Sequence, residues 1–191
     1  MSKVLAIDID GTVLTEICYD WFYDLKTIYP LKKEWSYVIH PRDHKLPYDL
    51  SEMFEIPEGH DAFTFWYEDN LYDQYVPRSD AISHIDALHL MGYKIIFVSK
   101  VIGNHGRSKT NFINKYFPYN QGVILTGQKH HIKCDYLIDD CMSVLNKMST
   151  DTITIKFRDD FNEGIQATRK HKLVYGFQDA FNYITTFGEN V

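Results

Sequence analysis

Short apolar runs, each ended by polar residues, recur along the chain. The clearest of them occupy residues 4–7, 94–98, 122–126 and 136–138. Short runs that are apolar throughout indicate strands buried on both faces, as in a parallel sheet. Two later segments, 152–157 and 173–175, are rich in β-branched or apolar residues and are predicted to be the fifth and sixth strands.

Segments with helical periodicity separate these runs. Residues 78–91 repeat apolar side chains at helical spacing and end before Gly92, residues 108–117 end before Pro118, and residues 177–185 form a closing helix. Because strands and helices alternate, the predicted fold class is α/β. We expect a Rossmann-like parallel sheet flanked by helices.

A long aromatic-rich segment separates the first strand from the second. It is too long for one crossover helix, and Pro30, Pro41, Pro47 and Pro57 divide it into short pieces. We expect helices over residues 49–55 and 58–69. The predicted division is therefore an α/β core formed by 1–15 and 76–191, and a small helical cap formed by 16–75.

Composition narrows the class of protein. A chain of 191 residues with 45% hydrophobic and 15% aromatic residues folds as one domain with a small insert and is not disordered. The net charge of -6 disfavours binding to a polymeric nucleic acid. Three cysteines without CxxC spacing suit a reduced protein with buried thiols. No apolar run is long enough for a membrane span, and the first residues lack the features of a signal peptide, so we expect a cytoplasmic protein without membrane contact.

Two acids follow the first strand. Asp8 and Asp10 are two residues apart, so both side chains can converge on one ligand beyond the end of the sheet. Two carboxylates without a neighbouring base repel each other unless a cation separates them, and hard oxygen ligands suit Mg²⁺. A strand that ends in a polar turn is the simpler explanation for these two residues taken alone.

Three more strand ends carry polar side chains. Ser99 ends the second strand, Lys129 follows the third, and the pair Asp139 and Asp140 ends the fourth. Taken singly, Ser99 could cap a helix and Lys129 could be a solvated loop lysine. Together with the first two acids they supply a nucleophile, an acid, a phosphate clamp and a metal anchor, which is the chemistry of phosphoryl transfer to a carboxylate.

The four segments resemble the motifs of the haloacid dehalogenase superfamily of aspartate-nucleophile phosphatases: DxDx[TV], a hydrophobic strand ending in Ser or Thr, a lysine, and an acidic pair. Residues 66–72 with Pro77, and residues 124–129 and 134–140, resemble the 5'(3')-deoxyribonucleotidase family more closely. The likeness runs from Lys3 to Asp140, with a weaker echo in 174–184.

The resemblance implies a role for each acid. Asp8 is the expected nucleophile and forms an aspartyl phosphate, and Asp10 is the expected general acid and base, for which its pKa should lie well above that of a free aspartate. Mg²⁺ is expected to be held by Asp8, by the carbonyl of Asp10 and by Asp139, with Asp140 supporting the site. Lys129 is expected to neutralise the charge shared by the nucleophile and the transferring group.

Substrate contacts are implied as well. Ser99 is expected to donate to a phosphoryl oxygen, and Trp66 to line the nucleotide pocket, although core packing explains a tryptophan equally well. Three positions depart from the family pattern: Gly127 replaces an arginine, Lys100 a serine and Glu16 an aromatic residue. Each position is expected to contact the base or the sugar phosphate, and Lys100 could replace the missing arginine charge.

The expected function is Mg²⁺-dependent hydrolysis of (deoxy)ribonucleoside monophosphates to nucleoside and phosphate. The alternatives are the same chemistry on another small phosphomonoester, such as a sugar phosphate, and a non-catalytic phosphate-binding protein. The expected partner is a small nucleotide, and the resemblance leaves a homodimer open. Other metal sites, at His40, Asp43 and His44 or at His130 and His131, are disfavoured because nothing fixes their geometry.

Overall fold

In the computed structural model, which describes residues 2–158, 161–162 and 164–187, a six-stranded sheet forms the centre of the molecule. Its strand order is β4-β3-β1-β5-β6-β8, and every neighbouring pair is parallel. The strands span Val4–Ile7 (β1), Lys94–Ser99 (β3), Val123–Leu125 (β4), Tyr136–Asp139 (β5), Ile153–Phe157 (β6) and Lys172–Val174 (β8). The predicted fold class and all six predicted strands are confirmed.

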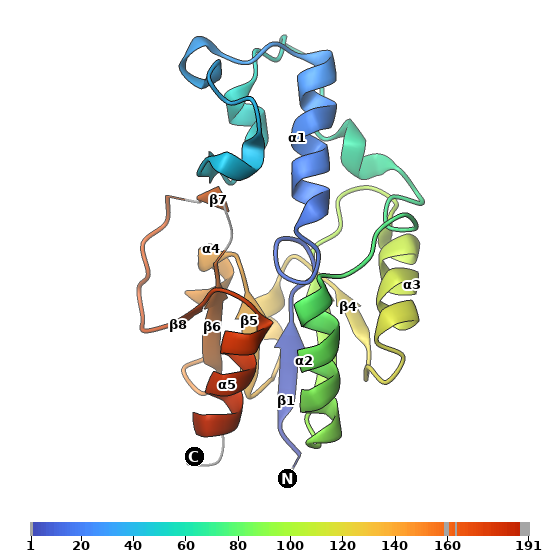
Figure 1. The fold of residues 1–191 in the computed structure, drawn as a ribbon, viewed down its shortest axis with the longest axis vertical. Helices are drawn as coiled ribbons and strands as arrows, with labels where there is room; N and C mark the ends of the chain where they lie inside the picture. The colour runs from blue at the N-terminus through green and yellow to red at the C-terminus, as the bar shows by residue number, and fades with distance from the viewer. Residues whose placement is uncertain (1, 159–160, 163, 188–191) are drawn as a thin grey trace.

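Helices follow the strands on both faces. The α-helices span Glu16–Ile28 (α1), Ser79–Leu90 (α2), Gly106–Tyr116 (α3), Met142–Leu145 (α4) and Phe177–Phe187 (α5). Helices α2 and α5 pack side by side over the sheet, while α3 lies beside the β4 edge (Figure 1). The three helices predicted for the core therefore correspond to α2, α3 and α5.

The sheet is buried on both faces. Leu5 and Ile7 of β1 belong to the large core, which α2 and α5 cover, whereas Ala6 belongs to a smaller cluster that contains Leu145 and Met148. Because successive side chains of a strand point to opposite faces, both faces need apolar residues, which explains the uninterrupted apolar runs. The edge strands are more exposed: Ile124 and Leu125 of β4 are 38% and 39% exposed, and Leu173 of β8 is 46% exposed.

The insert between β1 and α2 differs from the prediction in its elements. Helix α1 (Glu16–Ile28) is its main helix, and the helices expected over 49–55 and 58–69 are only short 3-10 turns at Leu50–Met53 and Thr64–Tyr67. Further 3-10 turns of the insert span Lys33–Trp35 and Pro41–Asp43, and one outside the insert, between β4 and β5, spans Lys129–His131. We call residues 16–75 the cap segment; its status as a separate domain stays a prediction.

The cap segment lies beyond the carboxyl ends of the strands (Figure 1). Within it, Trp21 of α1 donates a 3.0 Å hydrogen bond to the carbonyl of Ala62, and its ring stacks on Phe63. A short parallel pair, β2 (Leu46–Pro47) with β7 (Phe161–Asn162), joins the cap segment to the chain that follows β6.

No helix in the described ranges is both long enough and apolar enough to cross a bilayer. The three cysteines, which all lie in the described ranges, form no disulfide: Cys141 is buried, and Cys18 and Cys134 are partly buried.

Candidate active site

The strand order places the acids at a switch point of the sheet. After β1 the chain builds β3 and β4 on one side and then returns to place β5 on the other side of β1. Ligands of such sheets bind outside the carboxyl ends of the strands at this point. Asp8, directly after β1, and Asp139, at the end of β5, lie there.

Asp8 is buried and held by one of its two carboxylate oxygens. Oδ1 accepts a 2.8 Å hydrogen bond from the backbone N–H of Ile9 and lies 2.7 Å from Nζ of Lys129. Oδ2 has no hydrogen bond or ion pair within the described part of the chain. The carboxylate is therefore fixed in orientation while one oxygen stays available to a ligand.

Lys129 bridges two acids. Its Nζ also lies 2.8 Å from Oδ2 of Asp139, whose Oδ1 accepts a hydrogen bond from the backbone N–H of Cys141. Lys129 is only 6% exposed, so the alternative of a solvated loop lysine is wrong. Burial alone would lower the pKa of Lys129, but the charges of Asp139 and Asp8 outweigh it and raise that pKa.

Asp8, Asp139 and Asp140 form a compact acidic cluster. All three are buried, and their ligand atoms lie within 4.8 Å of one another. Burial, and then the charge of Asp8, raise the pKa of Asp139, while Lys129 acts against this shift. A raised pKa means that the ionised form of Asp139 lacks sufficient positive charge around it.

Gly11 makes room for Asp140. Its φ is +74°, and a Cβ placed there would lie 2.5 Å from Oδ2 of Asp140. Both the backbone conformation and the contact require glycine at this position. The glycine of the first motif thus lets the second acidic motif approach the loop after β1.

Asp10 points to a different set of partners. Its Oδ1 accepts a 2.6 Å hydrogen bond from the hydroxyl of Tyr72, and its Oδ2 accepts one of 2.6 Å from Nζ of Lys109. Ser99, at the end of β3, donates a 3.2 Å hydrogen bond to the same Oδ2. The structure therefore brings Asp10 and Ser99 together, and Ser99 is a buried partner of an acid rather than a helix cap.

The expectation of a raised pKa for Asp10 is wrong for this structure. Burial does push the pKa of Asp10 upward, but the charge and hydrogen bond of Lys109, together with the Tyr72 hydroxyl, outweigh burial and leave the pKa below its usual value. The cause is a second lysine that the sequence analysis did not assign to the site.

Lys109 is fully buried, and three acceptors surround its ammonium group. Nζ donates to Oδ2 of Asp10, to Oγ of Ser99 at 2.9 Å and to the carbonyl of Lys100 at 2.8 Å. The signal was present in the sequence: Lys109 shares the buried face of α3 with Phe112 at i+3 and Ile113 at i+4. A lysine on the apolar face of a helix needs a buried partner.

The site remains negative overall. Its four carboxylates, from Asp8, Asp10, Asp139 and Asp140, outnumber the two lysines, Lys109 and Lys129, whose ion pairs with Asp8, Asp10 and Asp139 the described residues show. Clustered carboxylate oxygens with an excess of negative charge suit a hard divalent cation. The residues present therefore fit Mg²⁺.

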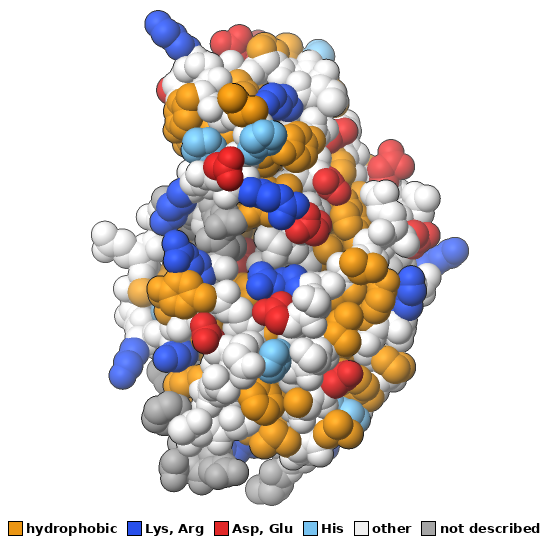
Figure 2. Space-filling model, viewed as in Figure 1, with side chains coloured by type: hydrophobic (Ala, Val, Ile, Leu, Met, Phe, Trp, Pro, Cys, Tyr) orange, Lys and Arg blue, Asp and Glu red, His pale blue; other side chains and the backbone are white. Residues whose placement is uncertain are grey.

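A cavity of about 300 Å³ opens beside these groups. Asp10, Asp140 and Lys100 line its polar end, and the cap segment contributes aromatic walls, Trp21, Phe63 and Trp66 among them. Trp66 packs edge-on against Trp21, with ring centroids 5.7 Å apart, so it serves both the core and the cavity wall. Charged side chains of both signs gather across the middle of the molecular face seen in Figure 2, between the cap segment and the sheet.

Only one of the three departures from the family pattern lines this cavity. Lys100 does, and its side chain has no ion pair within the described residues. Glu16 instead forms an ion pair with Arg42, which ties α1 to the 3-10 turn Pro41–Asp43. Gly127 is exposed and lies outside the cavity wall. The expectation that Glu16 and Gly127 contact the substrate is not supported by this placement.

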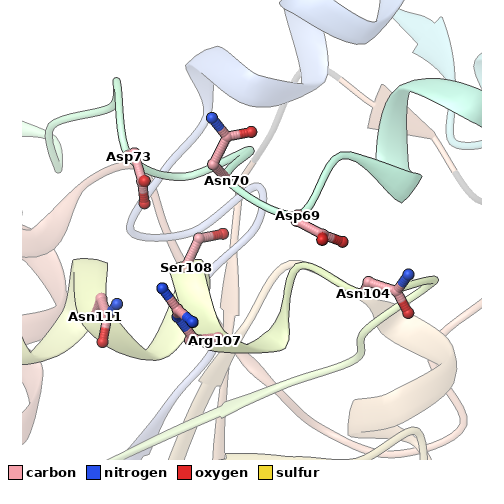
Figure 3. A pocket seen from close by; sticks show the side chains of 7 residues that line it. All are labelled: Asp69, Asn70, Asp73, Asn104, Arg107, Ser108 and Asn111. Atoms are coloured by element: carbon pink, nitrogen blue, oxygen red, sulfur yellow. The ribbon is translucent and has the colours of Figure 1, made fainter.

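A second hollow, of about 280 Å³, lies where the chain before α2 meets the start of α3 (Figure 3). Its lining is entirely polar: Asp69, Asn70, Asp73, Asn104, Arg107, Ser108 and Asn111. None of the residues predicted for the site is among them. In the described ranges, the one group of three or more potential metal ligands is the acidic cluster, so none of the histidine candidates belongs to such a group.

Comparisons with known proteins place this geometry in context. The chain is 29% identical over 153 residues to the 5'(3')-deoxyribonucleotidase of Bacillus subtilis (strain 168), which covers 73% of this chain and 77% of that protein, and equally to that of Bacillus phage SPbeta. Among solved structures, a Had-superfamily hydrolase from Ehrlichia chaffeensis matches with a TM-score of 0.59 at 14% identity over 97% of this chain and 98% of that one. A haloacid dehalogenase-like hydrolase from Xanthomonas campestris matches with a TM-score of 0.55 at 13% identity over 99% and 97%. No family model matches the sequence.

The solved structures confirm the predicted fold, that of haloacid dehalogenase-like hydrolases, and the comparisons support the predicted class of phosphoric monoester hydrolase. Within that class, the chain is similar to the 5'(3')-deoxyribonucleotidases, as the motifs predicted.

Replacing Gly11 by alanine should disturb the site more than the backbone conformation alone explains. We expect Gly11→Ala to lower the free energy of unfolding by roughly 1–3 kcal/mol, because the new Cβ adds a clash with Asp140 to the cost of a positive φ. Gly59→Ala is the matched control, since Gly59 has a φ of +82° but open space around it. Urea unfolding measures both variants, and equal losses would contradict the role of the Asp140 contact.

Replacing Lys109 by methionine should leave Asp10 without its main counter-charge. We expect Lys109→Met to lower the free energy of unfolding by about 2–3 kcal/mol, somewhat less than for a fully buried pair because the Asp10 side chain is 24% exposed. Lys115→Met, an exposed position on the same helix, should change it by about 0.5 kcal/mol or less. The double variant Asp10→Asn with Lys109→Met should recover part of the loss, and a double variant that is no more stable than Lys109→Met would contradict the pairing.

Proposed function

We propose that this protein is a Mg²⁺-dependent phosphatase that hydrolyses nucleoside monophosphates through a phosphorylated Asp8. The observation that carries the proposal is the lining of the cavity: Asp10, Asp140 and Lys100 line it together with aromatic side chains of the cap segment, which can accept a flat base. The similarity to two 5'(3')-deoxyribonucleotidases supports the choice of nucleotides.

Asp8 is suited to attack phosphorus. Oδ1 accepts from Ile9 and Lys129, which orients the carboxylate. One carboxylate oxygen of Asp8 forms the new bond to phosphorus while the bond between phosphorus and the ester oxygen breaks. Lys129 neutralises negative charge at the nucleophile. Asp8, Asp139 and the carbonyl of Asp10, with Asp140 beside them, would hold Mg²⁺, which would supply positive charge that reduces the repulsion between carboxylate and phosphate.

Asp10 acts as the general acid and the general base. As general acid it gives a proton to the departing nucleoside oxygen, and as general base it takes one from the water that attacks the phosphorylated Asp8. In the free protein, Lys109 and Tyr72 hold it ionised, which suits the second step. A bound phosphate adds negative charge beside Asp10 and competes for the Lys109 ammonium, and both effects raise the pKa of Asp10 toward the value that the first step requires.

Two further side chains contact the phosphate in this proposal. Ser99, already within hydrogen-bond distance of Asp10, donates to a phosphoryl oxygen, and Lys100 adds positive charge at the mouth of the cavity. Trp66 presents an aromatic surface for the base. The free thiols agree with the cytoplasmic location that we include in the proposal.

The substrate class is tested by phosphate release from a panel of deoxy- and ribonucleoside monophosphates, sugar phosphates and p-nitrophenyl phosphate. We expect kcat/KM to be at least about tenfold higher for the best nucleotide than for any sugar phosphate, because only a base can use the aromatic walls. Asp8→Asn should lose roughly a thousandfold in kcat on every substrate, since it lacks the nucleophile. Asp151→Asn, an exposed position, is the matched control. Substantial turnover by Asp8→Asn would refute the covalent route, and a sugar phosphate as best substrate would refute the nucleotide assignment.

Removal of divalent ions should abolish activity and weaken the fold. We expect EDTA treatment to stop phosphate release and Mg²⁺ to restore it, because the buried cluster of Asp8, Asp139 and Asp140 then lacks the cation that it would hold. Saturating Mg²⁺ should raise the Tm of the chelated protein, because an ion that binds the folded state stabilises it. Asp139→Asn should remove most of this Tm increase, and a Tm unaffected by Mg²⁺ in the unmodified protein would contradict the metal site.

A further inference from the structure

One acidic side chain of the cap segment lines the cavity and plays no part in the chemistry above. Asp49 is partly buried in the wall to which Trp21, Phe63 and Trp66 also belong. A carboxylate in a mainly aromatic wall is costly to desolvate unless something pairs with it. The contacts of Asp49 show what kind of group can pair with its carboxylate.

One of the two carboxylate oxygens of Asp49 already accepts hydrogen bonds. Oδ1 accepts hydrogen bonds from the backbone N–H of Ser51 at 3.0 Å and from its hydroxyl at 2.6 Å, so Asp49 caps the 3-10 turn Leu50–Met53. These two bonds use both lone pairs of Oδ1 and fix the orientation of the side chain. Oδ2 has no partner among the residues that the structure describes. A rigidly held acceptor thus remains at the cavity.

Asp49 belongs to the same part of the chain as the aromatic lining of the cavity. Like Trp21, Phe63 and Trp66, it comes from the cap segment. Asp10, Lys100 and Asp140, which also line the cavity, instead follow the strands β1, β3 and β5. Asp49 is therefore on the side of the cavity that would contact the base in the proposed binding mode.

We propose that Asp49 selects the base of the nucleotide: Oδ2 accepts a hydrogen bond from the exocyclic amino group of cytosine, adenine or guanine and disfavours thymine and uracil. This proposal rests on the function proposed above, because it assigns a base to the aromatic part of the cavity.

The selection follows from the chemistry of the two partners. An ionised carboxylate only accepts hydrogen bonds, so it needs a donor, and the amino groups of cytosine, adenine and guanine provide one. Thymine and uracil have no amino group, and their ring N–H lies between two carbonyl oxygens that would face the carboxylate oxygen. The aromatic walls stack on any base and do not discriminate. The discrimination therefore depends on Asp49.

The experiment compares kcat/KM for dCMP, dAMP, dGMP and dTMP, with p-nitrophenyl phosphate as a substrate that has no base. We expect at least one amino-bearing nucleotide to exceed dTMP by about tenfold or more. Asp49→Asn should remove or invert this preference, because Ser51 keeps the amide oxygen on its side and the amide N–H group then meets the base as a donor. Its activity on p-nitrophenyl phosphate should stay within about twofold of the unmodified protein.

Two further variants separate the selection from a general effect on the cap segment. Ser51→Ala frees the carboxylate to rotate and should weaken the preference without inverting it. Glu52→Gln changes an exposed acid of the same turn and should leave the preference unchanged. Equal kcat/KM for all four nucleotides, a dTMP preference in the unmodified protein, or a preference that survives Asp49→Asn would overturn the assignment of Asp49 while leaving the nucleotidase proposal intact. Hydrolysis of p-nitrophenyl phosphate without hydrolysis of any nucleotide would overturn both.

Discussion

The imbalance of charge at the carboxyl end of the sheet is the constraint on which the rest of this structure depends. Asp8, Asp139 and Asp140 are clustered where β1 and β5 adjoin, Asp10 lies toward β3, and in the described part of the chain two buried lysines pair with Asp8, Asp10 and Asp139. Such a cluster is tolerable because each lysine lies against specific carboxylate oxygens: Lys129 between Asp8 and Asp139, and Lys109 against Asp10. The same imbalance makes the site a receptor for a divalent cation.

The two lysines divide the acids into two functional groups. Lys129 pairs with two acids of the cluster that fits a metal, and Lys109 pairs with Asp10. Two aspartates that lie two residues apart in one motif thus acquire different electrostatic surroundings, since their partners come from different helices and loops. In the proposed mechanism, this separation lets one carboxylate attack while the other exchanges protons.

The sheet and most of the site could be predicted because their signals are local. Each strand is a short apolar run, and Asp8, Ser99 and Asp139 stand at the ends of three different strands. Parallel pairing of the strands alone therefore brings these residues to one edge of the sheet. Lys109 was missed because its role depends on the face of α3 on which it lies. The helical periodicity shows that, of the charged residues of this helix, Lys109 alone is on the buried face.

The cap segment was harder to predict because its pattern is ambiguous. Buried Ile17, Trp21 and Leu25 have the spacing of a helix, and Pro30 explains why α1 ends at Ile28, but the aromatic residues between them have low helix propensity. The helix expected over 58–69 does not form. This segment contains enough apolar residues for a helix, but its chain turns repeatedly and only Thr64–Tyr67 is helical.

The pairing of β2 with β7 has a mechanical consequence. Two backbone segments far apart in sequence, Leu46–Pro47 and Phe161–Asn162, are joined edge to edge, and the ring of Phe161 lies 5.6 Å from that of Tyr19 in α1. The strand pair therefore adds to the other contacts that hold the cap segment to the core, such as the hydrogen bond from Tyr72 to Asp10. A hinge-like swing of α1 away from the strands would have to separate this pair or move the segment after β6 with it.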